Sequence, residues 1–556
     1  MNMNGSQVVI ECLVEQGVDT VFGYPGGKIL NIYDELYKNR DRIRHILTAH
    51  EQGASHAADG YARSTGKVGV VIATSGPGAT NLVTGIATAY MDSVPMVAIT
   101  CNVSRALLGK DSFQEVDIAG VTMPVTKHNY IVKDAGELAT TLREAFAIAR
   151  SGRPGPVLVD IPQDITAATV EFTPATQEEL SARRTQAAPD SDIAAAAELI
   201  AKAERPLIYA GGGVIIGGAS DELRAFAERI DAPVAVSLMA KTAFPSAHPL
   251  CTGMIGMHGT KASNTACSRS DLLIAIGARF SDRVISDPAQ FARGSKVLHI
   301  DIDQAEINKN IPAFASVVGD VKDILSRLCA AVPARKHGEW LSKVDAWKRS
   351  VPAAYSADVP LHPKPALEYV RSAVGDDAII VTEVGQHQMW VAQFYQFSKP
   401  RTLLTSGGLG TMGYGTGAAI GAQVANPGRT VIHFAGDGSF RMNCNELATI
   451  SHYQLPIVIV VVNNGTLGMV RQWQSLFYGR RYSETTLDFA PDFVRLAEAY
   501  GIRGYRAATL DEFKSAFADA LAERRPAVID AGIGIDEMVL PMVPGGRPID
   551  ELLMEA

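Results

Sequence analysis

The chain has 556 residues, of which 47% are hydrophobic and 20% are charged, and its formal net charge is -8. This composition is that of a folded globular protein of several domains, and it excludes a disordered or fibrous chain. The acidic balance, without a long basic run, argues against a nucleic-acid partner.

The first predicted element is an amphipathic helix within MNMNGSQVVIECLVEQG, with Ser6 as its N-cap and Gly17 beyond its end. This segment does not have the pattern of a signal or transit peptide. No later apolar run approaches the roughly 18 residues that a membrane-spanning helix needs. The six cysteines are scattered without a C-x-x-C pair, which is typical of free thiols in a reducing compartment. We therefore expect a cytoplasmic protein without a membrane partner.

Short apolar runs bounded by Gly and Pro follow one another along the rest of the chain, with helical patterns between them. The clearest are VGVVIATSGPG, PVLVDIP, PLIYAGGG, LLIAIGAR, TVIHFAGDGS and IVIVVVNN. Strands that alternate with helices in this way predict parallel sheets with crossover helices. Such sheets bind ligands at the carboxyl ends of their strands, where the Gly clusters stand.

Two polar stretches interrupt this pattern and are interpreted as linkers, Thr173–Asp192 and Pro333–Pro365. They divide the chain into α/β domains at residues 1–175, 190–335 and 355–535, followed by a C-terminal tail at 536–556. No sequence repeat relates the domains. The predicted fold class is therefore α/β, with three doubly wound parallel sheets.

The strongest chemical signal is the G-D-G-S turn at residues 436–439, which follows the apolar run TVIHFA. The next apolar run ends in Asn463 and Asn464, and Asn464 stands about 27 positions after Asp437. Glycines let backbone N–H groups approach a diphosphate, and Asp and Asn oxygens are hard ligands for Mg²⁺. Two unrelated solvated turns are the alternative, but the spacing brackets one helix and one strand, as a shared site requires.

This pattern resembles the cofactor motif of thiamine-diphosphate-dependent enzymes. The resemblance implies that Asp437, Asn464 and the backbone carbonyl of Thr466 bind Mg²⁺. It also implies an apolar wedge under the cofactor at Met469 and a carbonyl at Gly410 that accepts the cofactor's exocyclic amino group. The remaining implied cofactor contacts are Tyr24, Gly27, Val384, Gly385, Gln386, His387, Met412, Gly436, Gly438, Ser439 and Gly468.

The same resemblance gives a catalytic role to Glu51, in TAHEQGASHAADGYAR. In the family, a Glu of the N-terminal domain hydrogen-bonds the pyrimidine ring nitrogen and promotes loss of the proton at thiazolium C2. Taken alone, Glu51 is more typical of the first turn of an exposed helix, where an acidic side chain favours the helix dipole. The G-Y-A-R and T-S-G-P-G-A-T-N blocks that follow favour the family match. Because this Glu meets the diphosphate domain of a second subunit in the family, a homodimer or tetramer is implied.

Sequence blocks along nearly the whole chain resemble the acetohydroxyacid synthase family, whose members are also called acetolactate synthases. These blocks are VFGYPGG, DSFQE, TSGRPGPVLVDIP, MIGMHG, GARFSDRV, HIDID and VLPMVPGG. The resemblance implies pyrimidine-binding, FAD-binding and diphosphate-binding domains, in that order. It also implies decarboxylation of pyruvate and transfer of the two-carbon unit to pyruvate or 2-oxobutanoate, in branched-chain amino acid biosynthesis. Alternatives with the same cofactor site are an FAD-dependent pyruvate oxidase, another 2-oxo acid decarboxylase and a catalytically silent paralogue, although the last should lack Glu51 or the metal ligands.

Four positions match family residues that contact the substrates. Phe113 and Gln114 correspond to residues beside the reacting carbons. Arg283 corresponds to the arginine that meets the carboxylate of the second 2-oxo acid, a task that suits its planar guanidinium. Trp473 corresponds to the tryptophan that favours 2-oxobutanoate through its extra methyl group.

The central domain resembles the FAD site of the family, with FAD in a structural role because the reaction transfers no net electrons. The matching residues are Arg153, Gly211, Gly212, Gly213, His258, Gly277, Ala278, Arg279, Asp301 and Asp320. The sequence departs from the family at Lys28, where Ala is usual, and at Gln163, where Lys is usual. No regulatory domain is visible after the third domain, so feedback control would need a separate small subunit.

Overall fold

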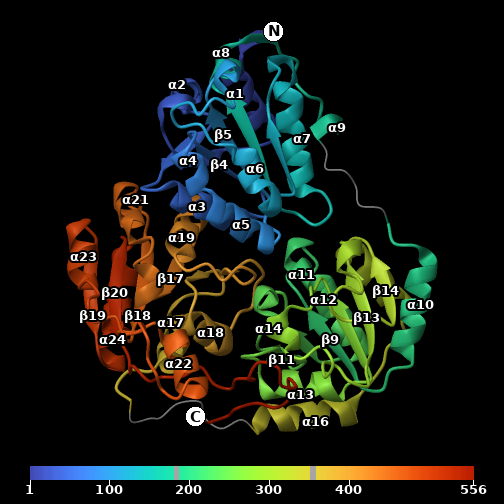
Figure 1. The fold of residues 1–556 in the computed structure, drawn as a ribbon. Helices are drawn as coiled ribbons and strands as arrows, with labels where there is room; N and C mark the ends of the chain where they lie inside the picture. Colours follow the sequence, from blue (N-terminus) through green and yellow to red (C-terminus); the bar gives the residue numbers. More distant parts are fainter. Residues whose placement is uncertain (181–186, 351–358, 556) are drawn as a thin grey trace.

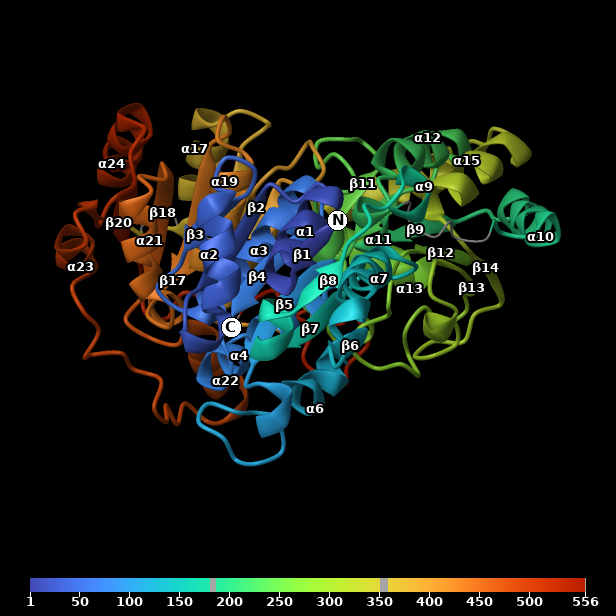
Figure 2. The same ribbon diagram turned by 90° about the horizontal axis from the view of Figure 1, so that it is seen from above.

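The computed structural model describes residues 1–180, 187–350 and 359–555. Three six-stranded sheets, in which every neighbouring pair of strands is parallel, confirm the predicted α/β class. Figure 1 shows the domain of the first sheet in blue, the central domain in green and the third domain in orange and red. Seen from above, the first domain lies across the junction of the other two (Figure 2).

The first domain has the strand order β3-β2-β4-β5-β7-β6. Its strands are β2 (Thr20–Tyr24), β3 (Arg44–Leu47), β4 (Gly69–Ala73), β5 (Met96–Asn102), β6 (His128–Ile131) and β7 (Pro156–Pro162). Its helices are α1 (Gly5–Glu15), α2 (Leu30–Lys38), α3 (Glu51–Thr65), α4 (Pro77–Asn81), α5 (Val83–Met91), α6 (Ile118–Thr122), α7 (Leu138–Arg150) and α8 (Gln163–Ala167). A small antiparallel pair, β1 (Asn2–Asn4) and β8 (Thr169–Glu171), joins the two ends of the domain.

The first helix begins two residues earlier than predicted. Asn4, and not Ser6, is the N-cap of α1, because its side chain accepts from the backbone N–H of Gln7 while the Gln7 side chain accepts from that of Asn4. This reciprocal capping box satisfies two backbone donors that a lone Ser6 would leave partly unpaired. Gly17 lies past the end of the helix, as predicted, with a φ of 73°.

The central domain has the strand order β11-β10-β9-β12-β13-β14. Its strands are β9 (Pro206–Ala210), β10 (Val234–Val236), β11 (Cys251–Met254), β12 (Leu272–Ile276), β13 (Lys296–Asp301) and β14 (Ala315–Val318). Its helices are α10 (Asp190–Ala201), α11 (Gly213–Ile216), α12 (Ser220–Ile230), α13 (Lys261–Arg269), α14 (Asp282–Ile285), α15 (Val321–Ala331) and α16 (Gly338–Arg349). The strand order reverses between β9 and β12, which places a ligand crevice at their carboxyl ends.

The predicted linkers contain more regular structure than expected. In the first, residues 177–180 form α9 (Gln177–Leu180) and α10 begins at Asp190, while residues 181–186 lie outside the described residues. The second linker prediction is wrong over Gly338–Arg349, which forms α16. Trp340, Val344 and Trp347 recur at helical spacing there and pack against the central domain. The charged residues between them obscured this apolar face in the sequence.

The third domain has the strand order β16-β15-β17-β18-β20-β19. Its strands are β15 (Ile379–Thr382), β16 (Leu403–Leu404), β17 (Val431–Gly436), β18 (Ile457–Asn463), β19 (Arg503–Ala507) and β20 (Ala527–Gly532). Its helices are α17 (Pro363–Ala373), α18 (Gln386–Phe394), α19 (Tyr414–Ala425), α20 (Asp437–Phe440), α21 (Leu447–His452), α22 (Gly468–Phe477), α23 (Phe493–Ala499) and α24 (Leu510–Glu523). Its strand order repeats that of the first domain position by position, although the sequence shows no repeat.

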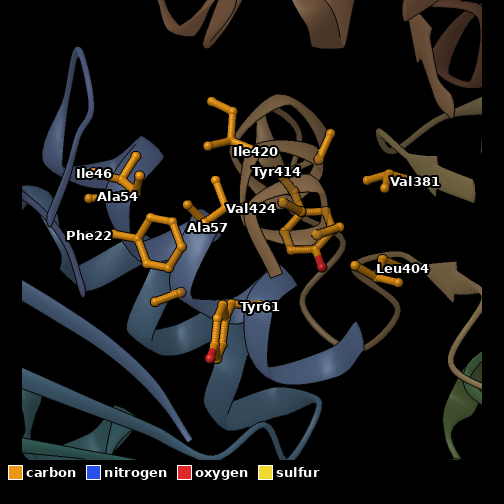
Figure 3. Close-up of a cluster of buried hydrophobic side chains, with 14 of the residues drawn as sticks. Phe22, Ile46, Ala54, Ala57, Tyr61, Val381, Leu404, Tyr414, Ile420 and Val424 are labelled. Atoms are coloured by element: carbon orange, nitrogen blue, oxygen red, sulfur yellow. The ribbon is translucent and has the colours of Figure 1, made fainter. Parts of the chain in front are cut away.

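The first and third domains share one hydrophobic core, because α3 packs along α19. Gly60 lies against the backbone carbonyl of Ala418, and Gly421 lies against that of Ala57, so neither glycine has room for a side chain. Figure 3 shows Phe22 and Tyr61 from the first domain beside Tyr414 from the third. Two helices in such close contact fix the first domain on the third.

Candidate active site

The predicted site residues of the first domain gather at the carboxyl edge of its sheet. Glu51 begins α3, is 9% exposed and accepts a hydrogen bond from Asn81 Nδ2 at 2.9 Å. Gly78 lies against the Glu51 carboxylate, and Gly76, with a φ of 58°, lies against the backbone of Gln114. Glu51 and Gln114 therefore flank the turn that follows β4.

Three more residues of this first group lie on the open side of the same edge. Tyr24 ends β2 and is 42% exposed, and Gly27 has no neighbouring atom within 4 Å of where a Cβ would stand. Phe113 is 82% exposed. Lys28, one of the departures from the family, lies in the same turn and donates its backbone N–H to Thr74 Oγ1 at 3.3 Å. Several large apolar side chains exposed around one edge, here Tyr24, Leu30 and Phe113, are typical of a surface that another molecule covers.

A second group of predicted residues lines a cavity of about 80 Å³ at the carboxyl edge of the third sheet. The strand order reverses there between β15 and β17, as it does in the first sheet between β2 and β4. The predicted residues in its lining are Val384, Gly385, Gln386, His387, Met412, Gly436, Asp437, Gly438, Ser439, Asn464, Thr466, Gly468 and Met469. The backbone N–H groups that begin α18, α20 and α22 thus converge on one small space, which suits an anion.

The side chains of this cavity fit a divalent cation. Asp437 Oδ1 accepts from the backbone N–H of Gly438 at 2.9 Å, whereas its Oδ2 is buried with no hydrogen-bond partner. Burial raises the pKa of Asp437 to about 6. The Asn464 amide donates to Gln386 Oε1 at 3.1 Å, which fixes its orientation. An unpaired buried carboxylate oxygen beside an oriented amide is a donor set that Mg²⁺ prefers.

Glu383 supports this cavity from behind and was missed by the sequence analysis. Its buried carboxylate accepts from Ser439 Oγ at 2.7 Å and from the backbone N–H groups of Gly413 and Gly415, both at 2.8 Å. Burial works to raise the pKa of Glu383, but the interactions with His433 and Ser439 lower it overall. The available signal was an acidic residue directly after the buried strand β15, one position before the residues that were singled out.

His387 lies in the same lining and is uncharged near neutral pH. Burial lowers the pKa of His387 to about 4, and its Nε2 atom is buried without a hydrogen-bond partner. A neutral imidazole keeps one N–H donor and adds no positive charge beside the metal ligands. It can therefore hydrogen-bond a phosphate oxygen without competing with a cation.

A much larger cavity, of about 860 Å³, lies where the three domains meet. All ten residues predicted for the FAD site line it: Arg153, Gly211, Gly212, Gly213, His258, Gly277, Ala278, Arg279, Asp301 and Asp320. The predicted residues Arg283, Val384, Gly385, Gly410, Met469 and Trp473 also line it. Its size suits a dinucleotide-sized ligand, and it occupies the reversal point of the central sheet.

Polar groups in this cavity are already paired or held in place. Arg153 donates to Glu306 at 2.7 Å and to Ser93 Oγ at 2.7 Å. Asp320 caps α15, and Asp301 accepts from the backbone N–H of Asp303 at 3.0 Å. Burial raises the pKa of Asp301 to about 6. Two carboxylates at the ends of β13 and β14 are acceptors that ribose hydroxyl groups can use.

The chain does not bring its two groups of thiamine-site residues together. Val384, Gly385 and Met469 line both cavities and thus connect them. Glu51, Phe113 and Gln114 line neither cavity, and neither do Tyr24 and Gly27. The backbone N–H groups of Ala49 and His50, just before Glu51, donate to Glu446 of the third domain, but the first group itself stays outside both cavities.

Within the described residues, no helix combines the length and apolar character needed to cross a membrane.

Comparison with known proteins accounts for all three domains. Residues 3–121 match the N-terminal TPP binding domain of thiamine pyrophosphate enzymes, residues 193–328 match their central domain, and residues 383–531 match their C-terminal TPP binding domain. A probable acetolactate synthase large subunit of Methanocaldococcus jannaschii is 48% identical, over 98% of this chain and 94% of the relative. An acetolactate synthase large subunit of Corynebacterium glutamicum is also 48% identical, over 98% of this chain and 89% of the relative. An acetolactate synthase large subunit of Lactococcus lactis is 44% identical, over 99% of this chain and 96% of the relative.

Proposed function

Because the chain belongs to the thiamine pyrophosphate enzyme family, and within it to the acetolactate synthases, we propose that its two groups of thiamine-site residues complete one another across a subunit interface. The chain catalyses the family's reaction. It decarboxylates pyruvate and joins the remaining two-carbon unit to pyruvate, giving 2-acetolactate, or to 2-oxobutanoate, giving 2-aceto-2-hydroxybutanoate. This is the first common step of valine, leucine and isoleucine biosynthesis. The same full-length similarity argues against the oxidase and decarboxylase alternatives, and the presence of Glu51, Asp437 and Asn464 argues against the silent paralogue.

The observation that carries the proposed interface is the separation of Glu51 from the diphosphate cavity of its own chain. Both groups lie at the carboxyl edges of sheets with the same strand order, so two copies related by a twofold axis can exchange them. Tyr24, Leu30 and Phe113 are 42%, 56% and 82% exposed around the first group. A second copy would cover this apolar surface. A homodimer, or a tetramer of such dimers, follows.

The residues have distinct tasks in the completed site. Asp437, Asn464 and the Thr466 carbonyl would hold Mg²⁺, and the N-terminal N–H groups of α18, α20 and α22 would hold the diphosphate. Thiamine diphosphate, when bound, supplies the carbon nucleophile for the keto carbon of pyruvate. Glu51 would hold the proton shared with the pyrimidine nitrogen, and Met469 would support the bent cofactor. Phe113 and Gln114 would cover the reacting carbons and limit the access of water.

The large cavity would hold FAD through the ten residues that line it. Its polar walls match a dinucleotide, and the carboxylates of Asp301 and Asp320 would accept from hydroxyl donors. The reaction is redox-neutral overall, so FAD would complete the wall of the active site and would not carry electrons. Arg283 lines the same cavity with 65% of its side chain exposed, and its ion pair with Asp282 is long at 3.8 Å, so its guanidinium would be able to pair with the carboxylate of the second 2-oxo acid.

A separate regulatory subunit is a further proposed partner. Relatives of the chain are named large subunits, which implies a smaller companion in those proteins. After β20, the described residues of this chain cross from the third domain to the central one: the backbone N–H of Val539 donates to Gln472 Oε1, and that of Val543 donates to the Met257 carbonyl. These residues therefore connect the third domain to the central one.

Mixing two inactive variants tests the shared site. We expect Glu51→Gln and Asp437→Ala to be inactive as separate proteins, and co-expression to restore roughly a quarter of wild-type activity. Half of the randomly paired dimers are mixed, and each mixed dimer has one intact site and one that carries both changes. The specific activity of the co-purified mixture measures this directly. No recovery, with mixed dimers confirmed by two affinity tags, would place each site within one chain.

Replacing Trp473 with Leu should lower the preference for 2-oxobutanoate as acceptor by about tenfold. The indole lines the active-site cavity and packs against the Phe477 ring at a centroid distance of 5.3 Å, so it presents an ordered apolar surface to the additional methyl group. A competition assay with both acceptors measures the product ratio. Tyr478→Leu is the matched control, because this exposed aromatic residue directly follows the same helix but lines neither cavity. An unchanged ratio in the Trp473 variant would leave the indole with a packing role only.

A further inference from the structure

Residues 406–410 form a wall that the two proposed cofactor sites share. Ser406, Gly407, Gly408, Leu409 and Gly410 all line the large cavity. Two residues beyond Gly410, Met412 lines the diphosphate cavity. This segment, which we call the shared wall, therefore has one side toward the proposed flavin and its far end at the proposed thiamine site.

Asp92, directly after α5 in the first domain, holds the shared wall by its backbone. Its carboxylate accepts from the N–H of Gly407 at 3.1 Å and from the N–H of Gly408 at 2.7 Å. Arg63 donates to the same carboxylate at 2.9 Å, and the Asp92 side chain has no exposed surface. A buried carboxylate that receives three N–H groups fixes the positions of the groups that donate to it.

Side chains of the central domain also lie against the shared wall. A Cβ on Gly408 would stand 2.7 Å from Asp92 Oδ1 and 3.1 Å from Arg279 Nη2. Gly407 lies directly against the Met239 side chain. Asp92, Met239 and Arg279 all line the large cavity, and Arg279 is one of its ten predicted flavin contacts. A ligand in that cavity would therefore contact the same side chains that lie against Gly407 and Gly408.

Further hydrogen bonds connect the first domain to the residues on either side of the shared wall. Arg63 also donates to the Thr405 carbonyl at 3.0 Å, just before the shared wall. Just after it, the hydroxyl groups of Thr88 and Thr411 lie 2.7 Å apart. The backbone from Thr405 to Thr411 is thus fastened to the first domain at both ends and in the middle. A shift of the Asp92 carboxylate would be transmitted to Gly410, whose carbonyl is proposed to face the thiamine cofactor.

We propose that Asp92 is a positioning residue that couples the two cofactor sites, so that FAD in the large cavity tightens the binding of thiamine diphosphate at the small one. The inference rests on the proposed assignment of the two cavities to these cofactors. FAD in the large cavity would fix the side chains of Asp92 and Arg279. These side chains would in turn fix the shared wall, whose last residue is Gly410. By linkage, thiamine diphosphate would tighten the binding of FAD by the same factor.

The experiment is a double titration of the flavin-stripped full-length protein, without pyruvate. The dissociation constant of thiamine diphosphate is measured by calorimetry at saturating Mg²⁺, with and without saturating FAD. We expect FAD to lower it by about fivefold or more in the wild type, within the usual range of coupling between two sites. In Asp92→Asn, the ratio of the dissociation constant without FAD to that with FAD should fall to about one. The amide NH₂ of Asn would face either a glycine N–H or the Arg63 guanidinium, so that donor opposes donor.

Two more variants separate this role from general destabilisation. Asp160→Asn alters another buried carboxylate of the first domain, which accepts from Thr100 and Asn102 and does not touch the shared wall, so its ratio should stay at the wild-type value. Thr88→Val removes only the neighbouring hydroxyl tie and should lower the ratio even if Asp92→Asn does not fold. Equal ratios in the wild type, Asp92→Asn and Thr88→Val, or no effect of FAD on the wild type, would overturn the coupling. Failure of FAD to bind the wild type at all would instead refute the proposed flavin site.

Discussion

Replacing Glu51 with Gln is expected to slow exchange of the C2 proton of bound thiamine diphosphate by about 10²- to 10⁴-fold, the usual contribution of a positioned proton-transfer group. Asn81 donates to Glu51 Oε2 at 2.9 Å, and the amide oxygen of Gln can accept the same hydrogen bond. The side chain therefore keeps its position and volume but loses its ability to take up a proton. The affinity for thiamine diphosphate should change little.

Acid-quenched hydrogen–deuterium exchange, followed by NMR of the released cofactor, measures this rate in the absence of substrate. Acetolactate formation should fall in parallel. Glu35→Gln is the matched control, because Glu35 is a buried carboxylate on α2 of the same domain, paired with Lys38 at 2.8 Å and lining neither cavity. Near-normal exchange in the Glu51 variant, with cofactor bound, would remove its catalytic role.

Replacing Asp437 with Ala should weaken Mg²⁺ and thiamine diphosphate together. The change deletes the buried carboxylate whose Oδ2 has no hydrogen-bond partner among the described residues, and the cation would be shared between this oxygen and the diphosphate. Loss of a group that only supports a metal ligand costs about 10- to 100-fold in metal affinity, and loss of a direct ligand should cost at least as much. Activity at ordinary cofactor concentrations should therefore disappear.

The two affinities are measured by titrating Mg²⁺ at fixed thiamine diphosphate, and then the cofactor at fixed Mg²⁺. High concentrations of both should recover part of the activity, since the reacting groups remain in place. Asp511→Ala, an exposed aspartate in the first turn of α24 in the same domain, is the control. If both affinities of the Asp437 variant equalled those of the control, the metal would have to bind elsewhere.

The sequence was sufficient to predict the three parallel sheets and the positions of most candidate residues. Strands such as β17 and β18 are continuous buried runs of β-branched and apolar residues, so their type and ends are visible without a structure. The turns that follow them carry Asp437 and Asn464, and short-range spacing placed both in one cavity. Local patterns of this kind contain most of the information that a strand-to-helix turn requires.

Contacts between distant parts of the chain could not be predicted in the same way. Asp92 has no motif around it, and its importance arises only because α5 ends beside Gly407 and Gly408, more than 300 residues later. Glu383 is similar, since its partners are backbone groups of a later helix. Helix α16 was missed because polar and charged residues separate Trp340, Val344 and Trp347, which pack against the central domain. In each case the evidence lies in packing partners that a single sequence does not reveal.

The close contact between α3 and α19 also affects how the chain is made. Roughly 350 residues separate the two helices, and a ribosome adds about 5 to 20 residues per second. The newly made first domain therefore presents the apolar side of α3, with Ala54, Ala57 and Ala58, for on the order of 20 to 70 seconds before its partner helix exists. During that interval this face is a target for chaperones or for premature association with another nascent chain.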